Sequence, residues 1–91
     1  MTFLYSWDAS VPGRDAGGVT HTEDAAKAAA VAWMRGHGAD CAVVERVRLA
    51  SSTRLVPAYV PTGYVLAAWR RKNNRIAWTR VHTPEAEQAA S

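Results

Sequence analysis

The sequence is poor in cysteine and in long apolar runs. Cys41 is its single cysteine, so no internal disulfide can form, which excludes a disulfide-rich secreted scaffold and fits a reducing cytosol. No apolar run approaches the roughly 20 residues that a membrane-spanning helix needs. The first ten residues lack the basic start and long apolar stretch of a signal peptide. We therefore expect a soluble cytoplasmic protein that does not associate with membranes.

Residues that carry metal or nucleophilic chemistry are also scarce. Among three histidines and one cysteine, only His37 and Cys41 lie close together in the sequence, whereas a zinc site normally takes four ligands. Cys41 heads an apolar strand, and a buried cysteine is usually inert. Asp8, Asp15 and Asp40 are scattered and form no acid/base pair in the sequence. We predict no metal, no cofactor and no catalytic residues, with an enzyme of unrecognised type as the second alternative.

Carboxylates are absent from the segment between Arg46 and His82. Residues 1–45 hold three basic and six acidic side chains, and the last nine residues add two glutamates, so the net charge of +3 hides a strong separation of sign. Segregated positive charge attracts polyanions. The segment contains eight basic residues: Arg46, Arg48, Arg54, Arg70, Arg71, Lys72, Arg75 and Arg80.

The first half of the chain predicts a strand, a turn and a helix. Aromatic side chains alternate over residues 3–7, the period of a strand, and turn-forming residues follow over 10–18 before a short strand at 18–21. An alanine-rich helix is predicted over 23–35, capped by the Thr22 hydroxyl and ended by glycine at positions 36 and 38. Its apolar stripe comprises Ala26, Ala29, Ala30 and Trp33.

The second half predicts further strands. Residues 41–49 form one, with Cys41, Val43, Val47 and Leu49 on its inner face and either a bulge or a local partner at Glu45. Residues 51–63 are irregular or an edge strand, because they contain two prolines. Residues 65–71 and 76–82 form a hairpin around a tight two-residue turn, Asn73–Asn74, since asparagine tolerates positive φ.

This two-residue turn sets the expected core. It places Trp69 opposite Trp78 on one face of the hairpin, so Trp33, Trp69 and Trp78 are predicted to be largely buried under the helix. The alternative is that Trp69 and Trp78 form an exposed stacking platform for bases.

We predict an α+β fold, a mainly antiparallel sheet of four to five strands with the helix packed on one face. Residues 1–82 form a single domain, and residues 83–91 form a short tail that begins a helix. The hairpin turn directs basic side chains away from the helix, and arginine suits phosphate contacts. The predicted nucleic-acid-binding residues are Arg46, Arg48, Arg70, Lys72 and Arg75.

The leading functional hypothesis is a small nucleic-acid-binding or accessory protein that uses this basic sheet face. DNA and RNA are not distinguished. The alternative is an interaction module that docks an acidic protein partner through the same charges, or that associates with itself through an edge strand. Both a monomer and a homodimer fit the sequence. A further alternative is that this charged face binds no partner and only keeps the protein soluble.

Overall fold

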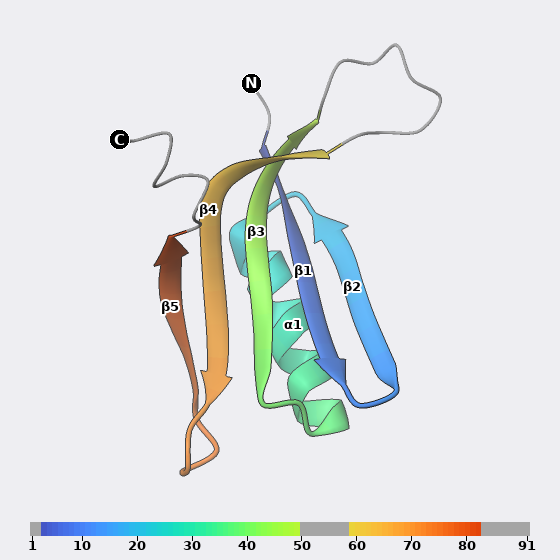
Figure 1. Cartoon of the computed structure of the whole chain (residues 1–91), viewed down its shortest axis with the longest axis vertical. Coiled ribbons are helices and arrows are strands. Elements are labelled where there is room, and N and C mark those ends of the chain that lie inside the picture. The colour runs from blue at the N-terminus through green and yellow to red at the C-terminus, as the bar shows by residue number, and fades with distance from the viewer. Residues whose placement is uncertain (1–2, 50–58, 83–91) are drawn as a thin grey trace.

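A computed structural model describes residues 3–49 and 59–82. In these residues five antiparallel strands form one sheet in the order β2-β1-β3-β4-β5, and a single helix lies on one face (Figure 1). The predicted α+β fold is therefore confirmed, whereas the predicted tail helix at residues 83–91 lies outside the described residues. The elements are β1 (Phe3–Val11), β2 (Arg14–Thr20), α1 (Glu23–His37), β3 (Cys41–Leu49), β4 (Tyr59–Arg70) and β5 (Ile76–His82).

Both ends of α1 have the capping groups that the sequence predicts. The Thr22 hydroxyl accepts the Ala25 N–H at 3.1 Å, and two acidic residues occupy the first turn, where the positive end of the helix dipole favours them. At the other end Gly38 takes the left-handed conformation, with φ 69°, and its N–H donates to the Met34 carbonyl. Glycine adopts this conformation without a Cβ clash. The helix extends to His37, two residues beyond the prediction.

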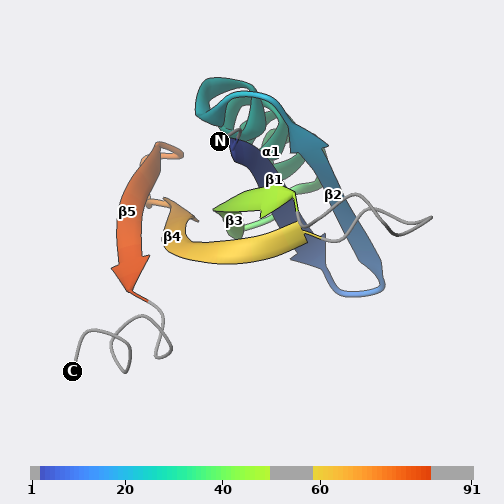
Figure 2. The same cartoon turned by 90° about the horizontal axis from the view of Figure 1, so that it is seen from above.

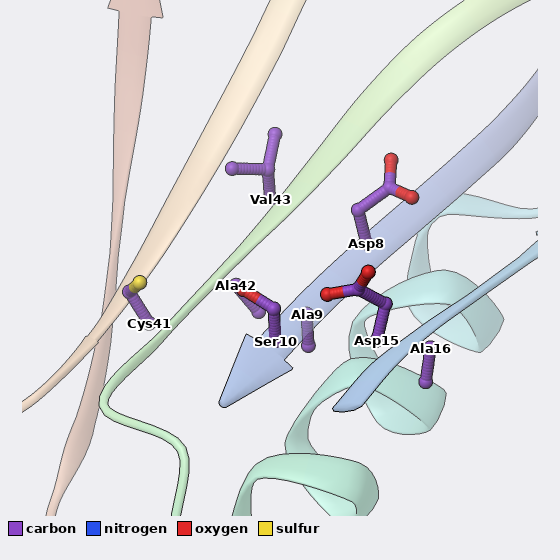
Figure 3. A pocket seen from close by; sticks show the side chains of 8 residues that line it. All are labelled: Asp8, Ala9, Ser10, Asp15, Ala16, Cys41, Ala42 and Val43. Atoms are coloured by element: carbon purple, nitrogen blue, oxygen red, sulfur yellow. The ribbon is translucent and has the colours of Figure 1, made fainter. Parts of the chain in front are cut away.

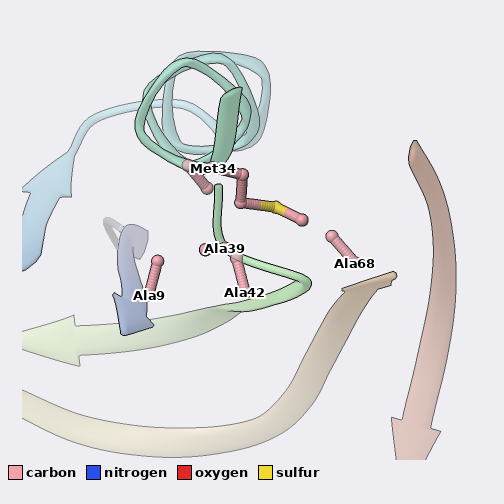
Figure 4. Close-up of a cluster of buried hydrophobic side chains, with 6 residues drawn as sticks. Ala9, Met34, Ala39, Ala42 and Ala68 are labelled. Atoms are coloured by element: carbon pink, nitrogen blue, oxygen red, sulfur yellow. The ribbon is translucent and has the colours of Figure 1, made fainter. Parts of the chain in front are cut away.

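The core between α1 and the sheet is built mostly from alanine. Figure 4 shows Met34 reaching from α1 toward Ala68 and Ala42, with Ala9 of β1 beside them. Ala26 and Ala30 complete the buried stripe of the helix, so the stripe has a spacing of four. It differs from the predicted one by including Met34, whereas Ala29 and Trp33 are only half-buried. Small side chains let the helix backbone approach the sheet closely. Figure 2 shows that α1 lies beside β1 and β2, and that β4 curves away.

The face of β3 that contacts the helix is the opposite of the predicted one. Ala42 and Val44 are fully buried beneath α1, whereas Cys41 and Val43 are exposed on the other face. The first half of β3 is apolar on both faces, so period-2 alternation does not choose between them. Because the alanine-rich helix approaches the sheet closely, the pair with the smaller side chains, Ala42 and Val44, faces it.

The β4–β5 turn has three residues, 72–74, and the predicted two-residue turn is wrong. The Asn74 N–H donates to the Arg71 carbonyl at 2.9 Å, and the Arg71 N–H donates to the Arg75 carbonyl at 2.7 Å. Asn74 has φ 65°. A three-residue hairpin of this kind combines a type I turn with one residue in the left-handed conformation, and Asn74 is that residue here.

The extra turn residue shifts the hairpin register by one. Trp78 pairs with Ala68 and Trp69 pairs with Ala77, so the two tryptophans lie on opposite faces of the sheet. Trp78 packs half-buried against the helix-side core, whereas Trp69 is 56% exposed. The predicted burial of Trp69 is therefore wrong, and Trp33 and Trp78 are half-buried rather than largely buried.

A bulge interrupts the pairing of β3 with β4, near the predicted position. Glu45 pairs with Val65, but Val47 pairs with Pro61, so β4 contains two more residues than β3 over this stretch. Gly63 absorbs the irregularity with φ 88°, because glycine reaches positive φ without a steric cost. The bulge brings Thr62 and Arg46 together at the end of the sheet that lies away from the β4–β5 turn.

Candidate nucleic-acid interface

The structure separates the five predicted binding residues into two groups. Arg70, Lys72 and Arg75 lie at the β4–β5 turn, where Cys41 begins β3 opposite Trp69. Arg46 and Arg48 are five and seven residues further along β3, which at about 3.3 Å per residue places them roughly 17–23 Å away. Arg46 and Arg70 also lie on the helix side of the sheet, because their neighbours Val44 and Ala68 do. The single outward basic surface predicted from the sequence is therefore not formed.

Arg46 is held in place by neighbouring side chains. Its Nε donates to the Thr62 hydroxyl at 3.2 Å, and its guanidinium carbon lies 4.5 Å from the centroid of the Phe3 ring and 4.9 Å from that of Tyr64. Cation–π contacts of this kind contribute about 0.5–2 kcal/mol each. Arg46 is therefore a structural residue at the bulge, whereas Arg48 beside it is exposed.

Negative charge offsets the arginines at this end of the sheet. The Tyr64 hydroxyl donates to Glu23 Oε1 at 2.8 Å, and Lys27 Nζ lies 3.1 Å from Glu23 Oε2. The Tyr64 hydrogen bond, followed by that of Lys27, holds the pKa of Glu23 below its usual value. The same bond raises the pKa of Tyr64, because it favours the protonated phenol. This end of the molecule thus retains a carboxylate beside its cations.

Arg70 stabilises the C-terminal end of α1. Its Nη2 donates to the Met34 carbonyl at 2.7 Å, the same oxygen that accepts the N–H groups of Gly38 and Ala39. A cation is favourable here because the carbonyls at a helix C-terminus carry partial negative charge. The Nε of Arg70 is buried and has no hydrogen-bond partner among the described residues. Arg70 therefore serves the fold and is poorly placed to contact a ligand.

Four other cations gather without such partners among the described residues, and we call them the hairpin site: Arg35, Arg71, Lys72 and Arg75. Arg35 comes from the last turn of α1, Lys72 from the β4–β5 turn, and Arg71 and Arg75 from the two positions that flank this turn. A hollow of about 450 Å³ is lined by all three arginines, together with Asn73, Ile76 and Ala77. All four cations are exposed.

Carboxylates do not neutralise the hairpin site within the described parts of the chain. The ion pair in the described residues joins Lys27 to Glu23, near the start of α1 and away from the hairpin site. Asp40 is at the same end of the sheet as the turn, since its carbonyl accepts the Arg70 N–H at 2.9 Å, but it forms no ion pair with a described residue. The Asn73 side chain accepts the Arg75 N–H at 3.1 Å and fixes the turn. The site therefore presents four formal positive charges to solvent.

Sequence reasoning identified Lys72 and Arg75 but missed Arg35 and Arg71. The predicted two-residue turn placed Arg71 at the end of the hairpin face that carries Trp69 and Trp78, which was expected to lie under the helix. Arg35 lies 36 positions before Arg71 and joins it only because Gly38 to Asp40 return the chain to the sheet beside β4. The basic residue in the last helical turn and the basic hairpin turn were both visible in the sequence, but their proximity was not.

A second hollow, of about 350 Å³, lies on the sheet face away from α1 and has the opposite character. Figure 3 shows Asp8 and Asp15 projecting from neighbouring strands, with Ser10 and Cys41 nearby. Its carboxylates would repel phosphate. Within residues 3–49 and 59–82, no three histidine, cysteine, aspartate or glutamate side chains are grouped as metal ligands.

The chain was compared with protein-family models, curated proteins and solved structures, and none of the three comparisons gives a match. In the part of the chain that the structure describes, no helix has the length and apolar character to cross a bilayer.

Proposed function

We propose that this chain binds nucleic acid through the hairpin site. The observation that carries the proposal is the hollow where Arg35, Arg71 and Arg75 converge without a carboxylate partner in the described residues. Neutralising phosphates with such side chains releases condensed counterions, which is enough to drive non-specific binding. Arginine adds a planar fork that holds phosphate oxygens in pairs.

The cost of keeping these cations close together supports a binding role. Like charges in one hollow repel, and that repulsion falls when an anion enters. Arg70 donates to one of the carbonyls at the end of α1, which reduces the partial negative charge that the helix terminus places beside these cations. Two fixed elements, the helix end and the hydrogen-bonded turn, also hold the site in place before a ligand arrives, which reduces the ordering cost of binding.

The proposal is tested by fluorescence anisotropy with a labelled oligonucleotide across a salt series. Four phosphate contacts predict a slope of log K against log salt of about −2.8 for a single strand and about −3.6 for a duplex. Replacing Arg71 and Arg75 together with alanine halves the number of contacts, so the slope becomes shallower by about 1.4 for the single strand.

A matched control removes the same charge elsewhere. Arg14 and Arg48 are exposed and lie outside the hairpin site, so the Arg14→Ala/Arg48→Ala variant changes the net charge equally and keeps a slope near that of the original protein. Equal effects of the two double variants would show that net charge alone drives binding. No binding at about 50 mM salt, where phosphate contacts are strong, would contradict the proposal and leave an acidic protein as the partner of these cations.

A further inference from the structure

On the basis of this proposed function, we infer that the hairpin site takes single-stranded nucleic acid in preference to duplex, with Trp69 as the surface on which an unpaired base stacks. Trp69 is the most exposed of the large apolar side chains in the described residues, at 56%. It lies three residues before Lys72, the first residue of the turn, and on the sheet face that α1 leaves open.

The neighbours of Trp69 leave its ring accessible. Its cross-strand partners are Cys41 on β3 and Ala77 on β5, and both are too small to cover an indole. Ala77 also lines the hollow of the hairpin site, so a residue that pairs with Trp69 belongs to that hollow, although Trp69 itself does not line it. Arg71 is two residues further along the chain and pairs through its backbone with Arg75.

An exposed indole together with basic side chains favours single strands over duplexes, because only a single strand offers unstacked bases. An aromatic ring beside cations provides a face for a base and charge for the adjoining phosphates, which is how sequence-tolerant single-strand binders work. The bases of a duplex are already stacked on one another, so their faces are not available to Trp69. A duplex can use only the phosphate contacts of the site. The indole therefore adds affinity for a single strand alone.

The experiment measures the affinities of Trp69→Ala, Trp69→Phe and a control variant for two probes. The single-stranded probe is an oligothymidylate of about 12 nucleotides, a length within the site sizes of single-strand binders. The duplex probe is the same strand paired with oligoadenylate. Trp69→Ala is expected to weaken single-strand binding roughly 5- to 150-fold, the loss of one stacked base, and to leave duplex binding unchanged within about twofold. Trp69→Phe retains most of the single-strand affinity. Stacking also quenches indole fluorescence in the original protein, and Trp69→Phe removes that signal.

Tyr59→Ala is the matched control, because Tyr59 is an aromatic residue of the same strand, 44% exposed, but ten residues from Trp69. It leaves both affinities unchanged. Equal losses for single strand and duplex in Trp69→Ala, or no loss for either, would overturn the inference. The proposed function would still stand if the Arg71→Ala/Arg75→Ala variant lost affinity and salt dependence, so the two failures are distinguishable.

Discussion

Arg70 offers the sharpest test of how the fold places the hairpin site. Its Nη2 donates to the Met34 carbonyl, and a hydrogen bond to a charged group contributes about 1.5–3 kcal/mol. Replacement by methionine keeps much of the apolar stem and removes the guanidinium. It also removes the buried Nε that has no partner among the described residues, which relieves a desolvation cost. We therefore expect the free energy of unfolding to fall by about 1.5–2 kcal/mol, near the lower end of that range.

Urea unfolding followed by circular dichroism measures this loss. For a small domain with a slope near 1 kcal/mol per molar urea, the midpoint of Arg70→Met falls by about 1.5–2 M. The adjacent Arg71→Met is the matched control, because Arg71 is exposed in the turn and such a substitution changes stability by no more than about 0.5 kcal/mol. If the two variants unfold at the same urea concentration, Arg70 does not stabilise the helix end and the division between structural and binding arginines fails.

Three further outcomes follow from the structure. Gly18→Ala should lower stability by about 1–3 kcal/mol in thermal unfolding, because its Cβ would lie 2.9 Å from Trp7 Nε1; unchanged stability would mean that the indole does not cover Gly18. Tyr64→Phe should raise the pKa of Glu23 in an NMR titration, because the hydrogen bond from Tyr64 lowers that pKa. The lowered pKa stabilises the fold above about pH 4.5, and this contribution is lost as the pH falls through the pKa of Glu23 in the folded protein. An unchanged Glu23 titration would exclude the hydrogen bond. Iodide should quench part of the tryptophan fluorescence, and Trp69→Phe should remove most of the quenchable fraction, whereas an equal fraction in both proteins would place the accessible indole elsewhere.

Local sequence signals determined the order of the elements of this protein, but not the bounds of two strands: β2 was predicted over 18–21 and spans Arg14–Thr20, and β4 was predicted over 65–71 and spans Tyr59–Arg70. Thr22, the acidic first turn and the glycines near position 38 define α1, because capping depends on residues within a few positions of the helix end. The bounds of β3 and β5 follow from short apolar runs between turn residues. The α+β class and the separation of positive from negative charge were also fixed at this level, since both depend on order and composition alone.

Tertiary structure decided which side chains share a surface. Asn73 and Asn74 predict a turn but not its length, and one extra residue reverses the face of every side chain that follows in a hairpin. That reversal placed Trp78 on the face opposite Trp69, so only Trp78 packs against the helix-side core, while Trp69 lies exposed beside its β3 partner Cys41. The apolar pattern of β3 fits either face, and the close approach of α1 selected the smaller residues. Arg35 joined the turn through the path of the chain after the helix, a long-range contact that no local period encodes.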